Sequence, residues 1–407
     1  MAGAVPARAA RLVFVAKTAR TFCYGFLGIA LPLHLSALGA DARGVGAMVT
    51  LTLASSAGLT WAVRRPAERH GAVGPLLALA ALSLAAAGLL LTTRTPGLVV
   101  LAAMLGNVAV GTGEAGPFLA LEQVVVTRGV APDRLPGALA VYNLLGYVAA
   151  ALGAAADALV PAPALFAAFG AGALAQIVVY ARLPRAGGLA PERRGVPRAA
   201  LPSTAIIRRL AALFALDAFA GGFVLQSLIA YWFAVRHGLR LDTLGWVFFA
   251  AQLLTALSFV AAAPLARRFG LIPTMVVTHL VSNILLIGVG LARSAPVAIA
   301  LLLARQLFSQ IDVPTRQAYV MSVVEDRERE AAASITNVAR TVAQAITPAF
   351  MGWALQGLAL AAPFVLGGGL KIVYDVLLYV TFRSVAPRAG VATAGDPSAG
   401  VGRRTES

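Results

Sequence analysis

Three acidic residues, Glu114, Asp217 and Asp312, lie near the middle of long apolar stretches of the 407-residue chain. A charged side chain at the centre of a bilayer costs roughly 2.5–3.5 kcal/mol on insertion scales, and such a residue usually faces a cavity or a partner. A low dielectric favours the neutral form of a carboxyl group, which makes proton exchange near neutral pH feasible. We therefore predict that the three carboxylates face a central water-filled cavity and couple protonation to substrate movement.

Two of these carboxylates also have a purely structural explanation. Asp312 and Arg316 are spaced i,i+4, so on a helix they can satisfy each other. Asp217 stands close to Gly221 and Gly222, small residues that allow helices to approach, and it can hydrogen-bond across helices. Glu114 has no basic residue within four positions, so no local partner accounts for it.

Uncharged polar residues are scattered through the same apolar stretches. We expect them to line the cavity and contact the substrate, although a polar residue in such a stretch often serves only as a hydrogen bond between helices. The candidates are Tyr24, Tyr142, Asn143, Gln226, Asn337 and Gln344.

No sequence feature predicts a metal, a cofactor or an enzyme active site. The chain has one cysteine, Cys23, and its four histidines stand far from other ligands in sequence. The stretch GTGEAG (111–116) fits G-x-G-x-x-G, but apolar flanks replace the strand and solvent-facing crevice that a dinucleotide site needs. The chain has no phosphate-binding G-x-x-x-x-G-K-[ST] loop and no grouped nucleophile, base and orienting residue.

Composition places these residues in an integral membrane protein, because 59% of the chain is hydrophobic and 12% charged. A membrane-crossing helix needs about 20 mostly apolar residues. The helical periodicity predicts an all-α fold with twelve transmembrane spans. Their expected limits are 18–38, 46–63, 72–92, 98–126, 136–158, 163–181, 205–234, 243–265, 270–291, 295–322, 330–354 and 362–384.

The net charge of +16 follows the expected membrane topology. Of the 33 Lys and Arg residues, 24 fall on the side of the termini, five on the other side and four within spans. This distribution predicts cytoplasmic termini. It also argues against nucleic-acid binding, since no basic face with interleaved aromatics stands on a soluble domain. The first apolar stretch contains Lys17 and Arg20, which argues against a cleavable signal peptide.

The two halves of the sequence match each other. RTFCYGF (20–26) aligns with DAFAGGF (217–223) at an offset of 197, ERHG (68–71) with RRFG (267–270) at 199, and Asn143 with Asn337 at 194. Six spans repeated in one orientation predict two bundles related by an axis along the membrane normal. We expect bundles over 1–181 and 205–385, a cytoplasmic linker over 182–204 and a disordered cytoplasmic tail over 386–407.

On these features the chain resembles the major facilitator superfamily (MFS) of secondary transporters. The family's loop between spans two and three is represented by Glu68, Arg69, His70 and Gly71, but Ala72 and Val73 replace its two basic residues. GPFLALEQ (116–123) and DVPTRQAYVMSVV (312–324) look like a bacterial, drug-efflux-like subgroup. Localisation in a bacterial inner membrane is the corresponding expectation.

The resemblance implies a cytoplasmic gate held by ion pairs. In the family, charged residues at the cytoplasmic ends of spans pair with the loop between spans two and three. Carried over, Glu122 pairs with Arg65 or Arg69, and Arg340 meets a helix end or a carboxylate across the bundles. The expected gate residues are Glu122, Gln123, Arg69, Arg316 and Arg340.

The expected function is alternating access by two rocking six-helix bundles, with proton-coupled efflux of a small amphipathic or drug-like compound. Part of this expectation rests on the scarcity of basic groups that would hold an anion in the cavity. The expected partners are a small-molecule substrate, protons and the lipid bilayer, and the expected state is a monomer. Two alternatives stay open: proton-linked uptake of a nutrient or metabolite, and a non-transporting membrane sensor or assembly factor on the same scaffold.

Overall fold

The computed structural model describes residues 4–109, 116–130, 135–184, 203–325, 328–357, 359–383 and 385, which form helices and no strand. Glu114, most of the predicted linker (185–202) and the predicted tail (386–407) lie outside the described residues. The N-terminal half contains α1 (Ala4–Ala37), α2 (Ala42–His70), α3 (Val73–Thr92), α4 (Pro96–Leu105), α5 (Pro117–Gly129), α6 (Leu135–Leu159) and α7 (Ala162–Ala181). The C-terminal half contains α8 (Thr204–Gly222), α9 (Gln226–His237), α10 (Leu241–Phe269), α11 (Leu271–Leu291), α12 (Ala295–Gln306), α13 (Asp312–Val323), α14 (Arg329–Gly357) and α15 (Ala362–Phe382).

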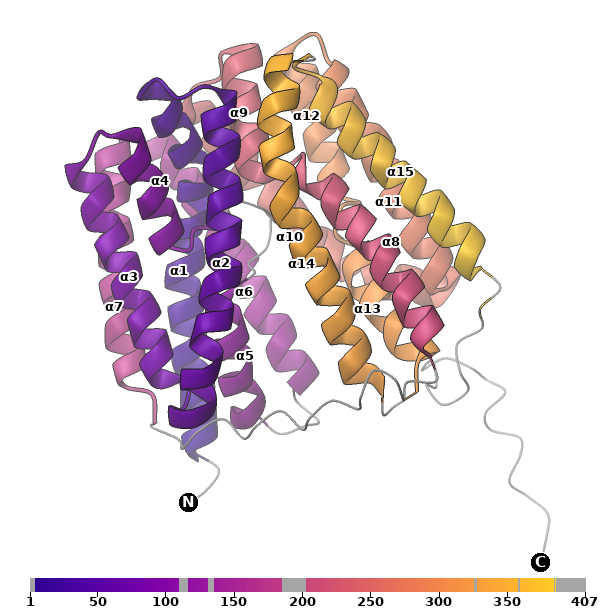
Figure 1. Ribbon diagram of the computed structural model, residues 1–407, viewed down its shortest axis with the longest axis horizontal. Helices are drawn as coiled ribbons and strands as arrows, with labels where there is room; N and C mark the ends of the chain where they lie inside the picture. The colour runs from indigo at the N-terminus through magenta and orange to yellow at the C-terminus, as the bar shows by residue number, and fades with distance from the viewer. Residues whose placement is uncertain are drawn as a thin grey trace, which may run out of the picture.

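These helices account for the twelve predicted spans. Nine spans correspond to single helices, whereas spans four, seven and ten are each divided into two, as α4 with α5, α8 with α9, and α12 with α13. Within the described ranges, nine helical segments are long and apolar enough to cross a membrane, and one of them joins α8 and α9. The all-α fold with two bundles, seen side by side in Figure 1, confirms the sequence-based prediction.

The breaks in the divided spans have local causes. After α4, Asn107 adopts a left-handed backbone with φ of 47°, and α5 starts with Pro117, which fits the first turn of a helix. The chain also leaves the helix between α8 and α9 and again over 307–311, before α13. Non-helical backbone at membrane depth is tolerated where it lines a cavity, because its polar groups then meet water or protein. The breaks are therefore expected where their backbone groups meet protein or a water-filled cavity.

Equivalent details recur in the two halves and agree with the internal repeat. Gly71 and Gly270 end α2 and α10 with φ of 88° and 86°, a backbone that favours glycine. On α1, Phe22 and Phe26 form an edge-to-face pair with ring centroids 5.8 Å apart. On α8 their counterparts Phe219 and Phe223 form the same pair at 5.7 Å.

Packing differs between the two ends of the bundles. At the end that carries the connections 38–41, 93–95 and 238–240, which we call the sealed end, residues from both halves form one buried apolar core. At the opposite end, which carries Gly71 and Gly270 and which we call the open end, the two halves have separate cores. The conformation is therefore closed at one end and parted at the other.

Candidate functional site

A buried ion pair joins α1 to α5 in the N-terminal half. The guanidinium of Arg20 donates to both carboxylate oxygens of Glu122, at 2.9 and 2.6 Å, and both side chains are essentially unexposed. The hydroxyls of Tyr142 and Tyr180 also donate to Glu122, at 2.7 and 2.5 Å, and Arg20 lies over the ring of Phe118. Glu122 thus accepts four hydrogen bonds, so one positive and one negative charge are balanced inside the bundle.

This pair corrects the expected gate. Glu122 was predicted to meet Arg65 or Arg69, but both of these arginines are exposed, and Arg64 of the same helix pairs with Glu68 at 2.8 Å. The prediction failed because α1 begins at Ala4, which places Arg20 in the middle of a long helix rather than near the start of a span that was expected to begin at residue 18.

In the C-terminal half, Asp217 of α8 is surrounded by basic side chains. Its carboxylate accepts hydrogen bonds from Lys371 of α15 at 2.5 Å, Arg340 of α14 at 2.9 Å and Arg316 of α13 at 3.4 Å. Arg340 was expected to reach a carboxylate across the bundles, whereas its carboxylate belongs to the same half. Arg316 and Arg340 therefore both contact Asp217 within the C-terminal half.

Two further contacts extend this cluster. Arg316 also donates to Asp312 at 2.8 Å, which is the i,i+4 pair that the spacing allowed. Behind Lys371, His279 of α11 bonds through Nδ1 to Asp375 of α15 at 2.7 Å, and Asn283 donates to the same carboxylate at 3.0 Å. The ring of His279 thereby links Asp375 to the Asp217 cluster, since its Nε2 lies 3.6 Å from Asp217.

The cluster lines a cavity of about 360 Å³ between the halves, which we call the cationic chamber. Among the described residues, its charged lining consists of four basic side chains and two acidic ones: Arg305, Arg316, Arg340, Lys371, Asp217 and Asp312. The residues of the helix breaks, including Asn107, Val224 and Ser309, contribute to the same wall. The expected scarcity of basic groups is therefore wrong, because side chains from four helices converge here.

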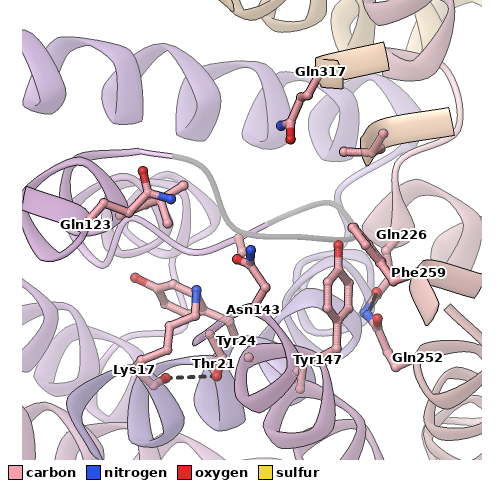
Figure 2. Close-up of a pocket in the computed structure, with 16 residues that line it drawn as sticks. Lys17, Thr21, Tyr24, Gln123, Asn143, Tyr147, Gln226, Gln252, Phe259 and Gln317 are labelled. Carbon is pink, nitrogen blue, oxygen red and sulfur yellow. Dashed lines mark hydrogen bonds between the residues drawn. The ribbon is translucent and has the colours of Figure 1, made fainter. Parts of the chain in front are cut away.

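A second cavity of about 260 Å³, the polar chamber, adjoins the cationic chamber through the shared residues Ala109 and Val313. Figure 2 shows Lys17, Tyr24 and Asn143 of the N-terminal half on one side of it and Gln226 and Gln252 of the C-terminal half on the other. Gln252 donates to Gln226 at 2.7 Å. The polar chamber offers mainly amide and hydroxyl groups to a ligand.

A third cavity of about 800 Å³, the apolar chamber, lies between α6, α10 and α13 towards the open end. Its walls are formed mainly by aliphatic side chains such as Leu144, Val260 and Ala263. It shares Asn143, Tyr147, Phe259 and Gln317 with the polar chamber, so the three chambers adjoin one another in sequence.

The predicted substrate-lining residues separate into two groups. Tyr24, Asn143 and Gln226 line the polar chamber, as does the predicted gate residue Gln123, and Gln344 lines the cationic chamber. Tyr142 instead is buried against Glu122, and Asn337 is exposed on α14 and lines none of the three chambers.

Sequence reasoning missed several members of the cationic chamber. Arg305 and Lys371 are two of the four basic residues that fall within the predicted spans. No role was predicted for them, although the same cost of burial applies. His279 was considered only as a metal ligand. Within the described part of the chain no group of three or more His, Cys, Asp or Glu side chains could hold a metal ion.

Comparison with known proteins agrees with this architecture. The family model described as "Major Facilitator Superfamily" matches residues 218–403. An uncharacterized membrane protein of Saccharomyces cerevisiae, YJR124C, is 21% identical over 92% of this chain and 94% of its own length.

Solved structures match nearly the whole chain at low sequence identity. The human organic anion transporter MFSD10 has a TM-score of 0.64 at 16% identity, covering 92% of this chain and 99% of that one. The nucleoside transporter NupG has a TM-score of 0.71 at 13% identity, covering 92% and 99%. A POT family peptide transporter has a TM-score of 0.73 at 12% identity, covering 95% and 99%.

These findings favour a multi-pass membrane transporter over an enzyme. The protein has the fold of the major facilitator transporters over nearly its whole length, and its C-terminal half matches the sequence model of that superfamily.

Proposed function

We propose that the protein is an alternating-access transporter for a small amphipathic organic anion. The observation that carries this proposal is the charge of the cationic chamber, in which four basic side chains face two acidic ones among the described residues. Because a cavity enclosed by low-dielectric walls focuses its field, such an excess of positive charge attracts an anionic group.

The contacts suggest how an anion would bind. Asp217 forms ion pairs with Lys371, Arg340 and Arg316. Arg316 also forms an ion pair with Asp312. Arg305 donates to the amide oxygen of Gln306 at 2.9 Å, and within the described residues it forms no ion pair. A carboxylate, sulfate or phosphate group could form an ion pair with Arg305 without displacing a carboxylate, and it would compete with Asp217 for Arg340.

The adjoining chambers support an amphipathic substrate. The polar chamber follows the cationic one, and the apolar chamber follows the polar one, so a charged head and an apolar body can be accommodated in sequence. A structure of similar fold is that of a human organic anion transporter, which is consistent with a substrate of this charge.

Packing supports the alternating-access part of the proposal. The halves share a core at the sealed end and have separate cores at the open end, so a rocking motion that exchanges these two arrangements would expose the chambers to the other side. With the termini in the cytoplasm, as the distribution of basic residues predicts, the open end faces inward.

Proton-coupled efflux remains our proposal for energy and direction. Asp217 and Asp312 are placed to exchange a proton when an anion rearranges their ion pairs, and we retain Glu114 as a third coupling carboxylate. An inside-negative membrane potential favours exit of an anion by about 2.3 kcal/mol per charge and 100 mV.

Uptake of a nutrient or metabolite is the alternative direction, and the sign of the substrate gradient in oriented vesicles separates the two. We also retain a bacterial inner membrane and a monomeric state as proposals.

The first experiment is a flux assay in proteoliposomes loaded with a pH-sensitive dye. The panel contains amphipathic carboxylates, sulfates and phosphates, with cationic and neutral compounds of matched apolar size. We expect flux with anions only, reduced roughly 10- to 100-fold by Arg305→Gln, since a hydrogen bond to a charged group contributes about 1.5–3 kcal/mol. The control Arg293→Gln changes an exposed arginine that lines none of the three chambers and should retain the flux.

Two outcomes would refute the anion assignment: flux with cations or neutral compounds alone, and anion flux that Arg305→Gln leaves intact. The coupling carboxylates are tested separately by Glu114→Gln and Asp312→Asn. If neither variant alters the protons moved per substrate, these residues do not couple transport to the proton gradient.

A further inference from the structure

Asp157, near the end of α6, is a buried carboxylate with no hydrogen-bond partner among the described residues. Its side chain is 3% exposed, and neither Oδ1 nor Oδ2 receives a hydrogen bond. Among the residues that the structure describes, the other carboxylates buried at membrane depth all accept hydrogen bonds from named donors: Glu122, Asp217, Asp312 and Asp375. Asp157 therefore belongs to neither cluster described above.

The surroundings of Asp157 place it in the seam that closes the sealed end. A Cβ atom added to Gly245 of α10 would lie 2.7 Å from the carbonyl oxygen of Ala154 and 3.1 Å from Cβ of Asp157. The backbones of α6 and α10, one from each half, therefore touch at this level. Ala154 and Leu244 belong to the apolar core that the two halves share. Opening the sealed end requires this contact to separate.

Other ionisable groups near Asp157 do not neutralise it. A surface recess of about 300 Å³ reaches Asp157 from the sealed end, and its other ionisable lining residues are Arg240 and Asp242 of α10. Both are largely exposed, and Arg240 lies 3.9 Å from Asp242. On α1, which packs against α6 at Gly153, His34 is the one ionisable side chain besides Cys23 and Tyr24 between Thr21 and Ala37, and its ring packs on Phe166 of α7.

An ionised carboxylate without donors is strongly disfavoured at such a site, whereas a protonated carboxyl group is tolerated. We propose that Asp157 is a proton-binding site that controls the gate at the sealed end: the seam between α6 and α10 closes around protonated Asp157, and its opening exposes the carboxyl group and releases the proton through the recess. This proposal rests on the alternating-access part of the proposed function and is independent of the nature of the substrate.

Linkage fixes the direction of the pH effect. Because the closed seam binds one more proton than the open seam, rising pH favours opening, and the ratio of open to closed molecules increases by up to tenfold per pH unit. Asn at position 157 resembles the protonated carboxyl group in shape and carries no charge, so Asp157→Asn should keep the seam closed at every pH.

The test is a distance measurement between two spin labels across the seam, without substrate. Leu159 is 71% exposed at the end of α6, and Thr243 is exposed at the start of α10. Cysteines at these two positions, in a chain with Cys23→Ser, carry the labels, and electron–electron resonance records the distances between pH 5.5 and 8.5 in liposomes.

We expect a longer-distance population that grows with pH in the parent chain, disappears in Asp157→Asn and persists in the control Asp242→Asn. An unchanged pH response in Asp157→Asn would overturn the proposal, as would distances in the parent chain that do not depend on pH. If the flux assay shows no anion transport but the distance across the seam still depends on pH, only the substrate assignment is contradicted.

Discussion

In the N-terminal half, Arg20 of α1 pairs with Glu122 of α5, whereas the equivalent positions of the C-terminal half hold Asp217 of α8 and Arg316 of α13. Arg20 and Asp217 are related by the offset of 197 residues that aligns α1 with α8. Glu122 and Arg316 are related by the offset of 194 that aligns Asn143 with Asn337. The repeat has kept a buried ion pair at one place in both bundles and has exchanged its signs.

The surroundings of the two pairs differ more than the pairs themselves. Arg20 and Glu122 are satisfied by each other and by two tyrosine hydroxyls, out of contact with solvent. Asp217, by contrast, has three basic partners and borders a cavity that contains a fourth basic residue. At this position of the scaffold, balanced charges in the N-terminal half hold helices together. In the C-terminal half, an excess of positive charge is available for ligand binding.

The largest expected effect comes from breaking the balanced pair. Glu122→Gln leaves the guanidinium of Arg20 buried without a counter-charge, a change that costs about 3–5 kcal/mol. We expect the melting temperature in detergent to fall by roughly 5–10 °C, at about 2 °C per kcal/mol. Added anions should not restore it, since Glu122 is unexposed.

The double variant Arg20→Met with Glu122→Met is the matched control. Removing both charges of a buried pair is far less costly than removing one, so most of the lost stability should return. A double variant no more stable than Glu122→Gln would show that the tyrosine hydrogen bonds, and not charge balance, dominate this cluster.

Much of the fold was predictable, because its signals lie in single segments. Apolar length and periodicity predicted the spans, and matched glycines such as Gly71 and Gly270 predicted the repeat. The pairing of charges was not predictable from one sequence. Glu122 is 102 residues from Arg20, and Asp217 is 154 from Lys371, so only the packing of helices identifies these partners.

The divided spans show the same limit. Apolar length predicts that 98–126 and 295–322 are continuous helices. In the structure α4 ends at Leu105 and α5 begins at Pro117, and the chain leaves the helix again over 307–311. Neither interruption was predictable. The segment 307–311 contains no proline, and a proline within a span kinks some helices and divides others depending on which neighbours accept its free backbone groups.

The second effect concerns how tightly each half is packed at equivalent glycines. A Cβ atom at Gly25 of α1 would collide with the carbonyl oxygen of Ala150, a backbone atom of α6. At Gly222 of α8 the nearest atom is Cβ of Thr347, at 2.5 Å. Overpacking costs typically 1–3 kcal/mol, and we place Gly25→Ala at the upper end because two helix backbones must separate.

Thermal melting in detergent checks this ranking. We expect Gly25→Ala to lower the melting temperature more than Gly222→Ala, because the Cβ added at Gly25 comes closer to its neighbour, a backbone carbonyl oxygen, than the Cβ added at Gly222 comes to Cβ of Thr347. Gly58→Ala on α2 is the control, since nothing lies within 4 Å of its added Cβ. Equal losses for Gly25→Ala and Gly222→Ala would show that the two halves are packed with the same tolerance.

A third effect tests the unbalanced cluster by removing its central anion. Asp217→Asn leaves Lys371 and Arg340 without their carboxylate, but the cationic chamber can admit a replacement. We expect a smaller loss of stability than in Glu122→Gln, and a melting temperature that rises with added organic anion more steeply than in the unaltered protein.

In Asp217→Asn the dissociation constant of the organic anion should be lower by roughly tenfold, because the anion no longer competes with Asp217. A tenfold change in the dissociation constant corresponds to about 1.4 kcal/mol of binding free energy. Isothermal titration with the anion selected by the flux assay measures it. An Asp217→Asn variant that anions neither stabilise nor bind more tightly would show that this carboxylate builds the site and does not compete within it.

The smallest effect separates two asparagines that the repeat makes equivalent. Asn143 of α6 lines both the polar and the apolar chamber, whereas Asn337 of α14 is exposed and lines none of the three chambers. An uncharged hydrogen bond contributes about 0.5–1.5 kcal/mol, so Asn143→Ala should weaken anion binding by about 2- to 10-fold. Asn337→Ala should leave binding unchanged. If both variants weaken binding equally, Asn337 lines the chambers in another conformation, and the asymmetry between the two asparagines belongs to this state alone.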